Sequence, residues 1–294
     1  MKILILKSSK MISVGVHVSI AGGLDKAVDR AKDRGCDVFQ IFSSNPRGWK
    51  TRPISVEEAE SFAVRFKESG LDLAVDHMPY LPNLASPKPD VYAKSVQALA
   101  NELARCQVLG IPYLVTHMGS HLGAGREKGI ERIVDALETA FYSVKSEVVL
   151  LLENTAGTKN SMGGSFKDIA EIIDSLGTRR ARLGVCLDTC HLFAAGYELR
   201  TQEGLAETLD EFQSSIGMER LKLLHLNDCR GELGSHMDRH EHIGLGQIGE
   251  NGFRAILSHL AKCRLPMILE TPVDSRRDDL GNLMAIRRLA LGLE

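Results

Sequence analysis

The chain has 294 residues, of which 44% are hydrophobic and 25% charged, a balance that excludes a disordered protein and suits one large α/β barrel or two ordinary domains. Its formal net charge of -2 argues against a protein whose whole surface binds nucleic acid, because phosphate contact usually needs a strongly basic balance. A local basic rim or bound metal ions could still attract phosphate to such a chain.

The N-terminus and the cysteines bear on the cellular compartment. The opening MKILILKSSK has an apolar stretch too short for a signal peptide, and no run approaches the ~20 apolar residues of a membrane span. The six cysteines are scattered and form no CxxC pair. We therefore expect a reduced, cytoplasmic protein with no membrane partner.

Eight short apolar runs rich in β-branched residues predict β-strands. In chain order they are ISVGVHV at 12–18, VFQIF at 38–42, LDLAVDH at 71–77, YLVTHM at 113–118, VVLLLEN at 148–154, RLGVCLD at 182–188, LKLLHLN at 221–227 and PMILET at 266–271.

Helical patterns lie between these runs. Ser55 and Glu58 form a capping-box signature before a helix that stops at Gly70. Further on, GIERIVDALETAFYSVKS at 129–146 places its apolar residues, from Ile130 to Val144, on one helical stripe. Other glycines close helical stretches just before the next strand, namely Gly35, Gly110, Gly177 and Gly217.

Eight β-then-α units with strands too apolar for a one-sided sheet predict a single (β/α)8 TIM barrel, with its active site at the C-terminal face of the strands. An open doubly wound sheet is the alternative, but no GxGxxG motif follows the first strand and polar residues end six strands instead of clustering at one point. The Pro-rich residues 82–90 are a short βα loop. The longest predicted loop, at 229–249, is Gly- and His-rich, so we expect it to carry function.

Nine side chains able to bind metal sit at or just beyond the ends of six of these strands. A single histidine there is more often buried and hydrogen-bonded than a ligand, but grouped carboxylates without Lys or Arg partners would repel one another, so cations are the natural neutralisers. The set contains no cysteine, which favours an open hydrolytic site over a structural zinc site, and it suits Zn, Mn or Fe. The nine are His77, His117, Glu153, Asp188, His191, His225, Asp238, His240 and Glu270.

The spacing within this set suggests how it divides. Asp188 and His191 are three residues apart at a strand exit, so they can point towards neighbouring metals. Asp238 and His240 are two apart on the same side of an extended segment, where both can bind one ion. Cys190, beside His191, is interpreted as a packing residue.

Several stretches, in order from about residue 11 to residue 272, closely resemble the endonuclease IV family of apurinic/apyrimidinic endonucleases. They are GVHVSIAGG, HMPYLPNLAS, THMGSH, LLENTAG, CLDTCHLFAAGY, HLNDCRGELGSHMDRHEHIGLGQIG and ILETP, and the combination of LDTCH, HLND and DRH is highly specific.

The resemblance implies a (β/α)8 barrel with three zinc ions per chain, with Mn²⁺ or Fe²⁺ as alternatives in some sites. His77 and His117 would bind one ion, and Glu153, the catalytic carboxylate, would bridge it to a second. The ligands of the second ion would also include Asp188, His225 and Glu270, and those of the third would be His191, Asp238 and His240.

The activity implied by the resemblance is base-excision repair. The enzyme would hydrolyse the phosphodiester 5' to an abasic site in duplex DNA, leaving a 3'-hydroxyl and a 5'-deoxyribose phosphate, using water whose pKa the metal ions lower. Removal of 3'-blocking groups would be a second activity. We expect a monomer with no organic cofactor.

By the same resemblance, Arg47, Tyr80 and Leu81 would penetrate the duplex beside the abasic site. Taken alone, Tyr80 and Leu81 could simply pack their loop, and Arg47 could stack on Trp49. Two loops depart from better-known members, SSNPRGW and ENTAGTKNSMGG, so the fit to DNA can differ. His17 and His121 lie outside the ligand set. We interpret them as residues that either hold the ligands in position or face phosphate.

Two other classes of function remain open at this point. A sugar isomerase or epimerase would use Glu153, Asp188, His225 and Glu270 but leaves the other ligands unexplained. A non-catalytic metal-dependent DNA-binding module would leave most of the ligands superfluous. The resemblance begins at Met11, so we expect a barrel domain over 11–294 preceded by an N-terminal extension at 1–10, which is either a true extension or the product of an upstream start codon.

Overall fold

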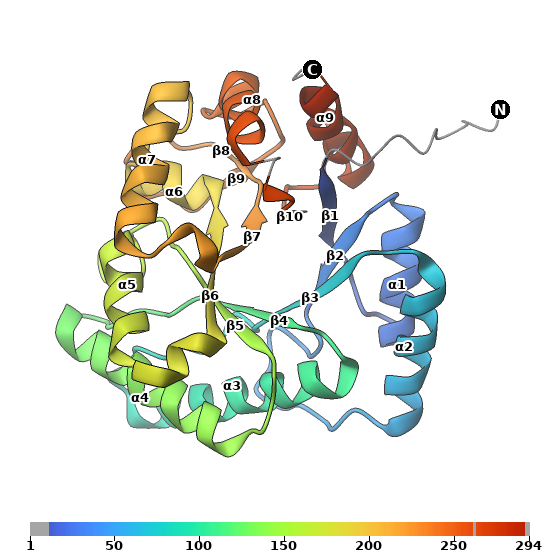
Figure 1. The fold of residues 1–294 in the computed structure, drawn as a ribbon. Helices are drawn as coiled ribbons and strands as arrows, with labels where there is room; N and C mark the ends of the chain where they lie inside the picture. The colour runs from blue at the N-terminus through green and yellow to red at the C-terminus, as the bar shows by residue number, and fades with distance from the viewer. Residues whose placement is uncertain (1–11, 261–262, 292–294) are drawn as a thin grey trace.

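The computed structural model describes residues 12–260 and 263–291, and the predicted extension at 1–10 lies outside the described residues. Eight parallel strands close into a barrel in which β1 pairs with both β2 and β10 (Figure 1). The barrel strands are β1(Ser13–His17), β2(Val38–Ile41), β3(Leu73–His77), β4(Tyr113–Thr116), β5(Val149–Glu153), β6(Leu183–Asp188), β7(Leu221–His225) and β10(Pro266–Leu269). Each lies within a predicted run. The (β/α)8 fold is confirmed and the open-sheet alternative is excluded.

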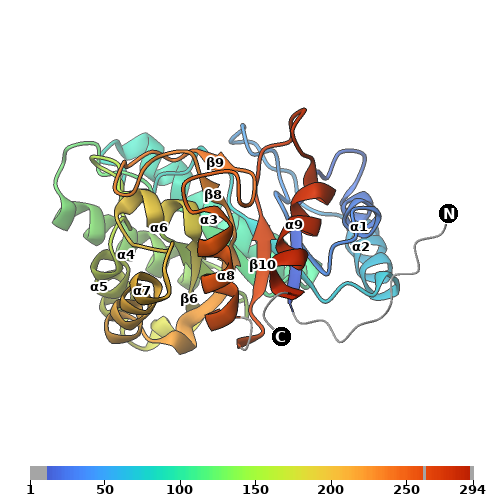
Figure 2. The same cartoon turned by 90° about the horizontal axis from the view of Figure 1, so that it is seen from above.

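Helices surround the barrel on the outside (Figure 2). They are α1(Leu24–Asp33), α2(Val56–Ser69), α3(Pro89–Leu109), α4(Arg126–Ser143), α5(Phe166–Ser175), α6(Thr189–Ala195), α7(Gln202–Ser215), α8(Gly249–Leu260) and α9(Asp279–Leu291), with 3-10 turns η1(Gly177–Arg182) and η2(Met218–Arg220). No helix in the described part of the chain is long and apolar enough to cross a membrane.

The helix ends follow the predicted local signals. Ser55 and Glu58 form both bonds of a capping box at the start of α2, and Gly70 ends that helix in the left-handed conformation at φ 76°. Two details differ from expectation. Val144 was expected on the helical stripe, but α4 ends at Ser143 and Val144 is extended. Gly177 was expected to end a helix, but it begins η1, separated from the end of α5 by one residue.

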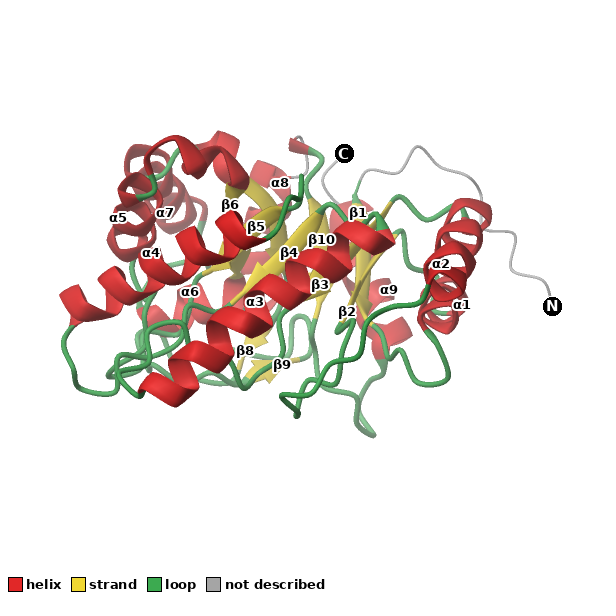
Figure 3. Cartoon of the chain, turned by 90° about the horizontal axis from the view of Figure 1, so that it is seen from below, coloured by secondary structure: helices red, strands yellow, loops and turns green. Residues whose placement is uncertain are grey.

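The long loop at 229–249 is more ordered than expected. A short antiparallel pair, β8(Asp228–Cys229) and β9(His240–Glu241), ties its beginning to its middle. Figure 3 shows this pair and the long connecting loops gathered at one end of the barrel, which is the C-terminal end of the strands. The loops that carry candidate site residues therefore meet there.

Apolar side chains fill the barrel in one compact layer, to which seven of the eight strands contribute. The layer consists of Val38, Val75, Val115, Leu151, Cys186, Leu223 and Ile268. The remaining strand, β1, has Gly15 at this level, where a Cβ atom would lie 1.6 Å from the carbonyl oxygen of Val38, so no side chain fits. A larger apolar layer packs the strands against the helices.

Candidate metal centre

Strand alternation builds the site directly above this apolar layer. Side chains two residues apart on a strand point to the same side, so the residue two places after each inward apolar residue also points into the barrel. Val75 is thus followed by His77, and Leu151 by Glu153. The complete upper layer is His17, Gln40, His77, His117, Glu153, Asp188, His225 and Glu270.

The other three predicted ligands come from connections outside the strands. His191 lies in the first turn of α6, whose N-cap is Asp188, and the Asp188 carboxylate accepts the His191 backbone N–H at 2.8 Å. Asp238 and His240 come from the long loop, with His240 on β9. Capping of α6 therefore holds His191 beside Asp188, although the two side chains belong to different candidate groups.

The structure brings all nine predicted ligands together in three groups, and within each group the ligand atoms lie within 4.8 Å of one another. The groups are His77, His117 and Glu153; Glu153, Asp188, His225 and Glu270; and His191, Asp238 and His240. These three groups have the same members as the sets that the resemblance implied, and a fourth group combines Asp188 and His240 with Cys190. Glu153 belongs to two groups.

Glu153 is fully buried, and its two carboxylate oxygens face different imidazoles. Oε2 lies 3.1 Å from Nε2 of His77 and 3.5 Å from Nε2 of His117. Oε1 lies 3.1 Å from Nδ1 of His225, a member of the second group. One carboxylate is therefore shared by two of the candidate groups.

Hydrogen bonds on the outer side of four imidazoles determine where each ring carries its proton. Each outer nitrogen faces a carbonyl oxygen, which can only accept, so the ring donates outwards and turns its other nitrogen into the site. The bonds run from His77 Nδ1 to Met78 O at 2.7 Å, from His191 Nδ1 to Asn154 O at 3.0 Å, from His225 Nε2 to Gln40 Oε1 at 2.9 Å and from His240 Nδ1 to Glu270 O at 3.1 Å.

His240 gives an independent indication that these groups fit a cation. Its Nε2 is buried and has no hydrogen-bond partner. That nitrogen lies 3.5 Å from an oxygen of Asp188 and 3.7 Å from an oxygen of Asp238. Since its proton is on Nδ1, Nε2 turns a lone pair towards two carboxylates, and a positive ion would relieve this arrangement.

The charges of the site are tightly interdependent. Burial raises the pKa of Glu153, but the charges of His117 and His225 and hydrogen bonds from His191 and His225 outweigh it and hold that pKa well below its usual range. Burial lowers the pKa of His191, yet the charge of Asp188 and hydrogen bonds to acidic neighbours raise it well above 6.5. Without a metal, protons on the imidazoles would take the place of the cations.

Residues 28–289 match the family described as the xylose isomerase-like TIM barrel. The chain is 57% identical over 281 residues to "Probable endonuclease 4" of Methanoculleus marisnigri, and the match covers 95% of this chain and 99% of the relative. The chain belongs to the endonuclease IV family. The crystal structure of endonuclease IV from Thermus thermophilus superposes with a TM-score of 0.84 at 37% identity, covering 95% of this chain and 99% of that one.

The barrel also resembles proteins outside the endonuclease IV family. The crystal structure of a D-tagatose 3-epimerase-like protein matches with a TM-score of 0.71 at 17% identity, covering 95% of this chain and 98% of that one. At this identity the match shows a shared fold alone, so function depends on the site.

A hollow of about 460 Å³ is lined by members of all three candidate groups and by one of the predicted DNA-wedge residues, Tyr80. Tyr80, 66% exposed, lines it beside His117 and Asp238, and its ring meets Phe42 edge-on at 5.0 Å. The Tyr80 backbone N–H donates to Pro46 O at 3.2 Å, which links its loop to the loop of Arg47.

The other predicted wedge residues are also accessible. Leu81 is 39% exposed and Arg47 is exposed, so neither is a core packing residue. The cation recorded over the Trp49 ring is Lys94, at 6.0 Å, so Lys94 takes the place that we considered for Arg47.

Three amides support the ligands, and the sequence analysis did not select them. Gln40 accepts from His225 and donates to Glu270 Oε1 at 2.6 Å. Asn227 donates to Asp188 at 2.6 Å and accepts the Glu270 backbone N–H at 2.8 Å. The third, Asn154, binds the backbone of Asp188. Gln40 could have been found from alternation, since it follows inward-facing Val38 by two residues.

His17, His121 and Cys190, which the sequence analysis left outside the ligand set, lie in three different environments. His17 completes the upper layer, 3.1 Å from Gln40. His121 instead accepts two loop N–H groups through Nδ1 and so orders the turn before α4. Cys190 lies within ligand distance of Asp188 and His240, and its hydrogen bond to Cys229, together with burial, raises the pKa of its thiol.

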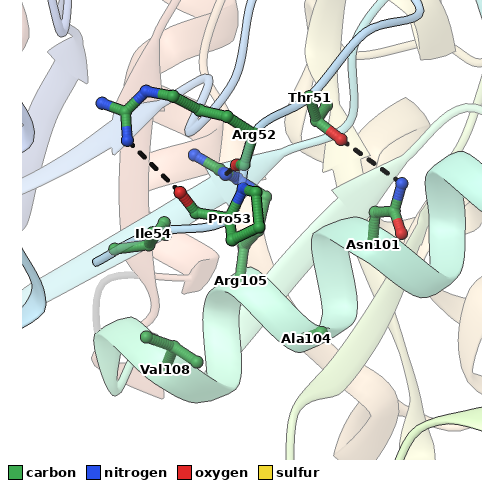
Figure 4. Close-up of a pocket in the computed structure, with 8 residues that line it drawn as sticks. All are labelled: Thr51, Arg52, Pro53, Ile54, Asn101, Ala104, Arg105 and Val108. Carbon is green, nitrogen blue, oxygen red and sulfur yellow. Dashed lines mark hydrogen bonds between the residues drawn. The ribbon is translucent and has the colours of Figure 1, made fainter. Parts of the chain in front are cut away.

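A second hollow, of about 300 Å³, lies between residues 51–54 and α3 and is separate from the metal groups (Figure 4). Its polar groups are already paired. Arg105 donates to Arg52 O at 2.7 Å, and the Asn101 amide donates to Thr51 Oγ1 at 3.3 Å. These hydrogen bonds hold residues 51–54, which follow Arg47, against α3. The hollow is therefore not a candidate for the catalytic site.

Proposed function

We propose that the protein is a DNA-repair endonuclease that hydrolyses the phosphodiester 5' to abasic sites in duplex DNA, leaving a 3'-hydroxyl and a 5'-deoxyribose phosphate. Removal of 3'-blocking groups is proposed as a second activity of the same site. Membership of the endonuclease IV family supports this function. The observation that carries it is the position of Glu153, whose two oxygens serve two ligand groups beside a third group.

The proposed cofactors are three Zn²⁺ ions per chain, with Mn²⁺ or Fe²⁺ as alternatives in some sites. Bound ions of this kind neutralise phosphate charge and lower the pKa of water. The chain contributes the nine ligands, holds the imidazoles in one tautomer, and places Glu153 as the catalytic carboxylate between the first two groups. In this scheme water is the nucleophile, and no side chain attacks the phosphate.

Selectivity for abasic DNA is assigned to Arg47, Tyr80 and Leu81. All three are exposed at the rim, and Tyr80 borders the hollow above the ligands. Turning a nucleotide out of the duplex costs a few kcal/mol, and the cost is least where the base is absent. Residues that enter the duplex can therefore convert this difference into a preference for damaged sites.

A sugar isomerase or epimerase is the weaker candidate. The group of Glu153, Asp188, His225 and Glu270 would suffice for it, but the orphaned Nε2 of His240 and the two further groups would have no purpose. A metal-dependent DNA-binding module fails for the same reason. We further propose that the enzyme acts as a cytoplasmic monomer and that residues 11–294 form its single domain.

The decisive experiment uses a duplex with one tetrahydrofuran abasic analogue, which cannot undergo β-elimination. The zinc-loaded protein should nick it on the 5' side and leave the undamaged duplex intact. Prolonged chelation should abolish nicking and zinc should restore it, with elemental analysis identifying the metals. Absence of a nick with zinc loaded would refute the hydrolase assignment.

A further inference from the structure

A buried carboxylate at the base of the long loop makes an unusual number of contacts with that loop. Asp228, the first residue of β8, is fully buried, and its side chain accepts backbone N–H groups along the loop. The donors are Cys229 at 2.8 Å, Gly244 and Gly246 at 2.9 Å each, Ile248 at 2.9 Å and Gly249 at 3.3 Å.

The far side of the loop is drawn tightly onto this carboxylate. A Cβ atom at Gly246 would lie 2.4 Å from the Cys229 carbonyl oxygen and 2.5 Å from the carboxylate of Asp228, so only glycine fits there. The Gln247 N–H also donates to Cys229 O at 2.7 Å. Asp228 thus closes the loop into a ring whose two ends meet at one side chain.

The third ligand group depends on the part of the loop that lies between these ends. Both Asp238 and His240 belong to it, and His240 pairs with Cys229, the neighbour of Asp228, in the β8–β9 register. Asp238 has a side chain that is 57% exposed, so little packing holds it in place. His191 alone of this group comes from a helix. The position of two ligands therefore follows from how the loop is closed.

We propose that Asp228 is a positioning residue for the third metal group, and that it delivers Asp238 and His240 to His191 as a preformed unit. This inference rests on the proposed function, because it takes the third group to bind an ion. An open loop would have to be ordered when the metal binds, and that entropic cost would weaken binding at this group. The first two groups come from residues at or just after the ends of barrel strands and take no ligand from the loop.

Asp228→Asn tests the proposal with little change in volume. The amide nitrogen would turn a donor towards N–H groups that now meet a carboxylate oxygen. We expect zinc affinity at the third group to fall by about 10–100-fold, the usual effect of removing a ligand's support, while the other two ions are retained. Asp37→Asn is the matched control. Asp37 accepts the Val14 N–H at 3.3 Å and Arg287 at 2.9 Å at the opposite end of the barrel.

The measurement is zinc per chain by elemental analysis after dialysis against a graded series of zinc buffers, with hydrogen exchange of residues 229–249 followed in parallel. The expected result is three ions in the parent and the control but two in Asp228→Asn, with faster exchange confined to the loop. Higher free zinc should restore the third ion, because all its ligands remain. If Asp228 only stabilised the fold as a whole, higher free zinc would not restore the third ion selectively.

Three ions held with unchanged affinity by Asp228→Asn would overturn the inference. Fewer than three ions in the parent protein would instead overturn the proposed trinuclear site, and the inference with it. Gly246→Ala provides a second test if Asp228→Asn does not fold, since its Cβ would push the loop off the carboxylate. It should also lose the third ion selectively, and a full complement at unchanged affinity would count against the proposal.

Discussion

Gln40 allows a quantitative test of how the site is supported. Gln40→Met keeps the approximate volume and removes both polar ends of a side chain that is 0% exposed. The Nε2–H of His225 and the Oε1 of Glu270 would lose partners at 2.9 and 2.6 Å. An unsatisfied buried polar group costs about 1–3 kcal/mol, and of the two only His225 is fully buried, so the substitution predicts a loss of about 1–3 kcal/mol in the free energy of unfolding of the metal-free protein.

The same substitution should change metal binding, because His225 would no longer be held with Nδ1 turned inwards. We expect zinc affinity at the middle group to fall by about 10–100-fold. Zinc titration and denaturant unfolding, with and without zinc, measure both effects. Gln97→Met is the control, since Gln97 is exposed on α3 and its amide donates to Asn101 Oδ1 at 2.9 Å, away from the candidate groups. Parent-like zinc affinity in Gln40→Met would refute the supporting role of the amide.

Three further outcomes are expected. Glu153→Gln should lower the nicking rate by at least about 10²-fold while duplex binding in a gel shift persists, and normal nicking would exclude Glu153 as the catalytic carboxylate. In the metal-free protein the charge of Asp188 and hydrogen bonds to Asp238 and Glu153 outweigh burial and raise the pKa of His191 well above 6.5, and Cys186, Glu270 and Glu153 raise that of His225 in the same way. Their contribution to stability is complete below about pH 6.5 and is lost as the pH rises through the raised values. Zinc should therefore raise Tm more at about pH 8 than at about pH 6 in calorimetry, and the opposite trend would contradict this linkage. The hydroxyls of Ser43 and Ser44, just before the Arg47 loop, donate to the two carboxylate oxygens of Glu102. Glu102→Gln removes one of these acceptors, so KM for abasic duplex should rise several-fold, while zinc content and kcat stay unchanged. A lower zinc content in that variant would show that its effect is not confined to the loop.

The strands and the polar residues at their ends were predictable because both depend on local pattern. An apolar run such as VVLLLEN identifies a buried strand, and the polar residue at its end, Glu153, must emerge at the C-terminal face of any parallel barrel. The pairing of Asp238 with His240 also followed from a two-residue spacing. The proposals for the wedge residues and for the metal identity depend on the family resemblance, since exposed side chains leave no periodic signal.

The supporting residues were not predictable in the same way. Gln40 and His225 are 185 residues apart and meet only when the barrel closes. The order within the loop at 229–249 was also missed, because Asp228 organises it through backbone N–H groups that carry no sequence signature.

By itself the sequence determined the barrel, its family and the kinds of ligand atom at its rim, because strand periodicity and side-chain chemistry are properties of short segments. Only the tertiary structure decided which oxygen of Glu153 faces which imidazole, and which nitrogen of each ring points inwards. Those choices depend on hydrogen bonds between distant strands and loops, and such contacts exist only in the folded molecule.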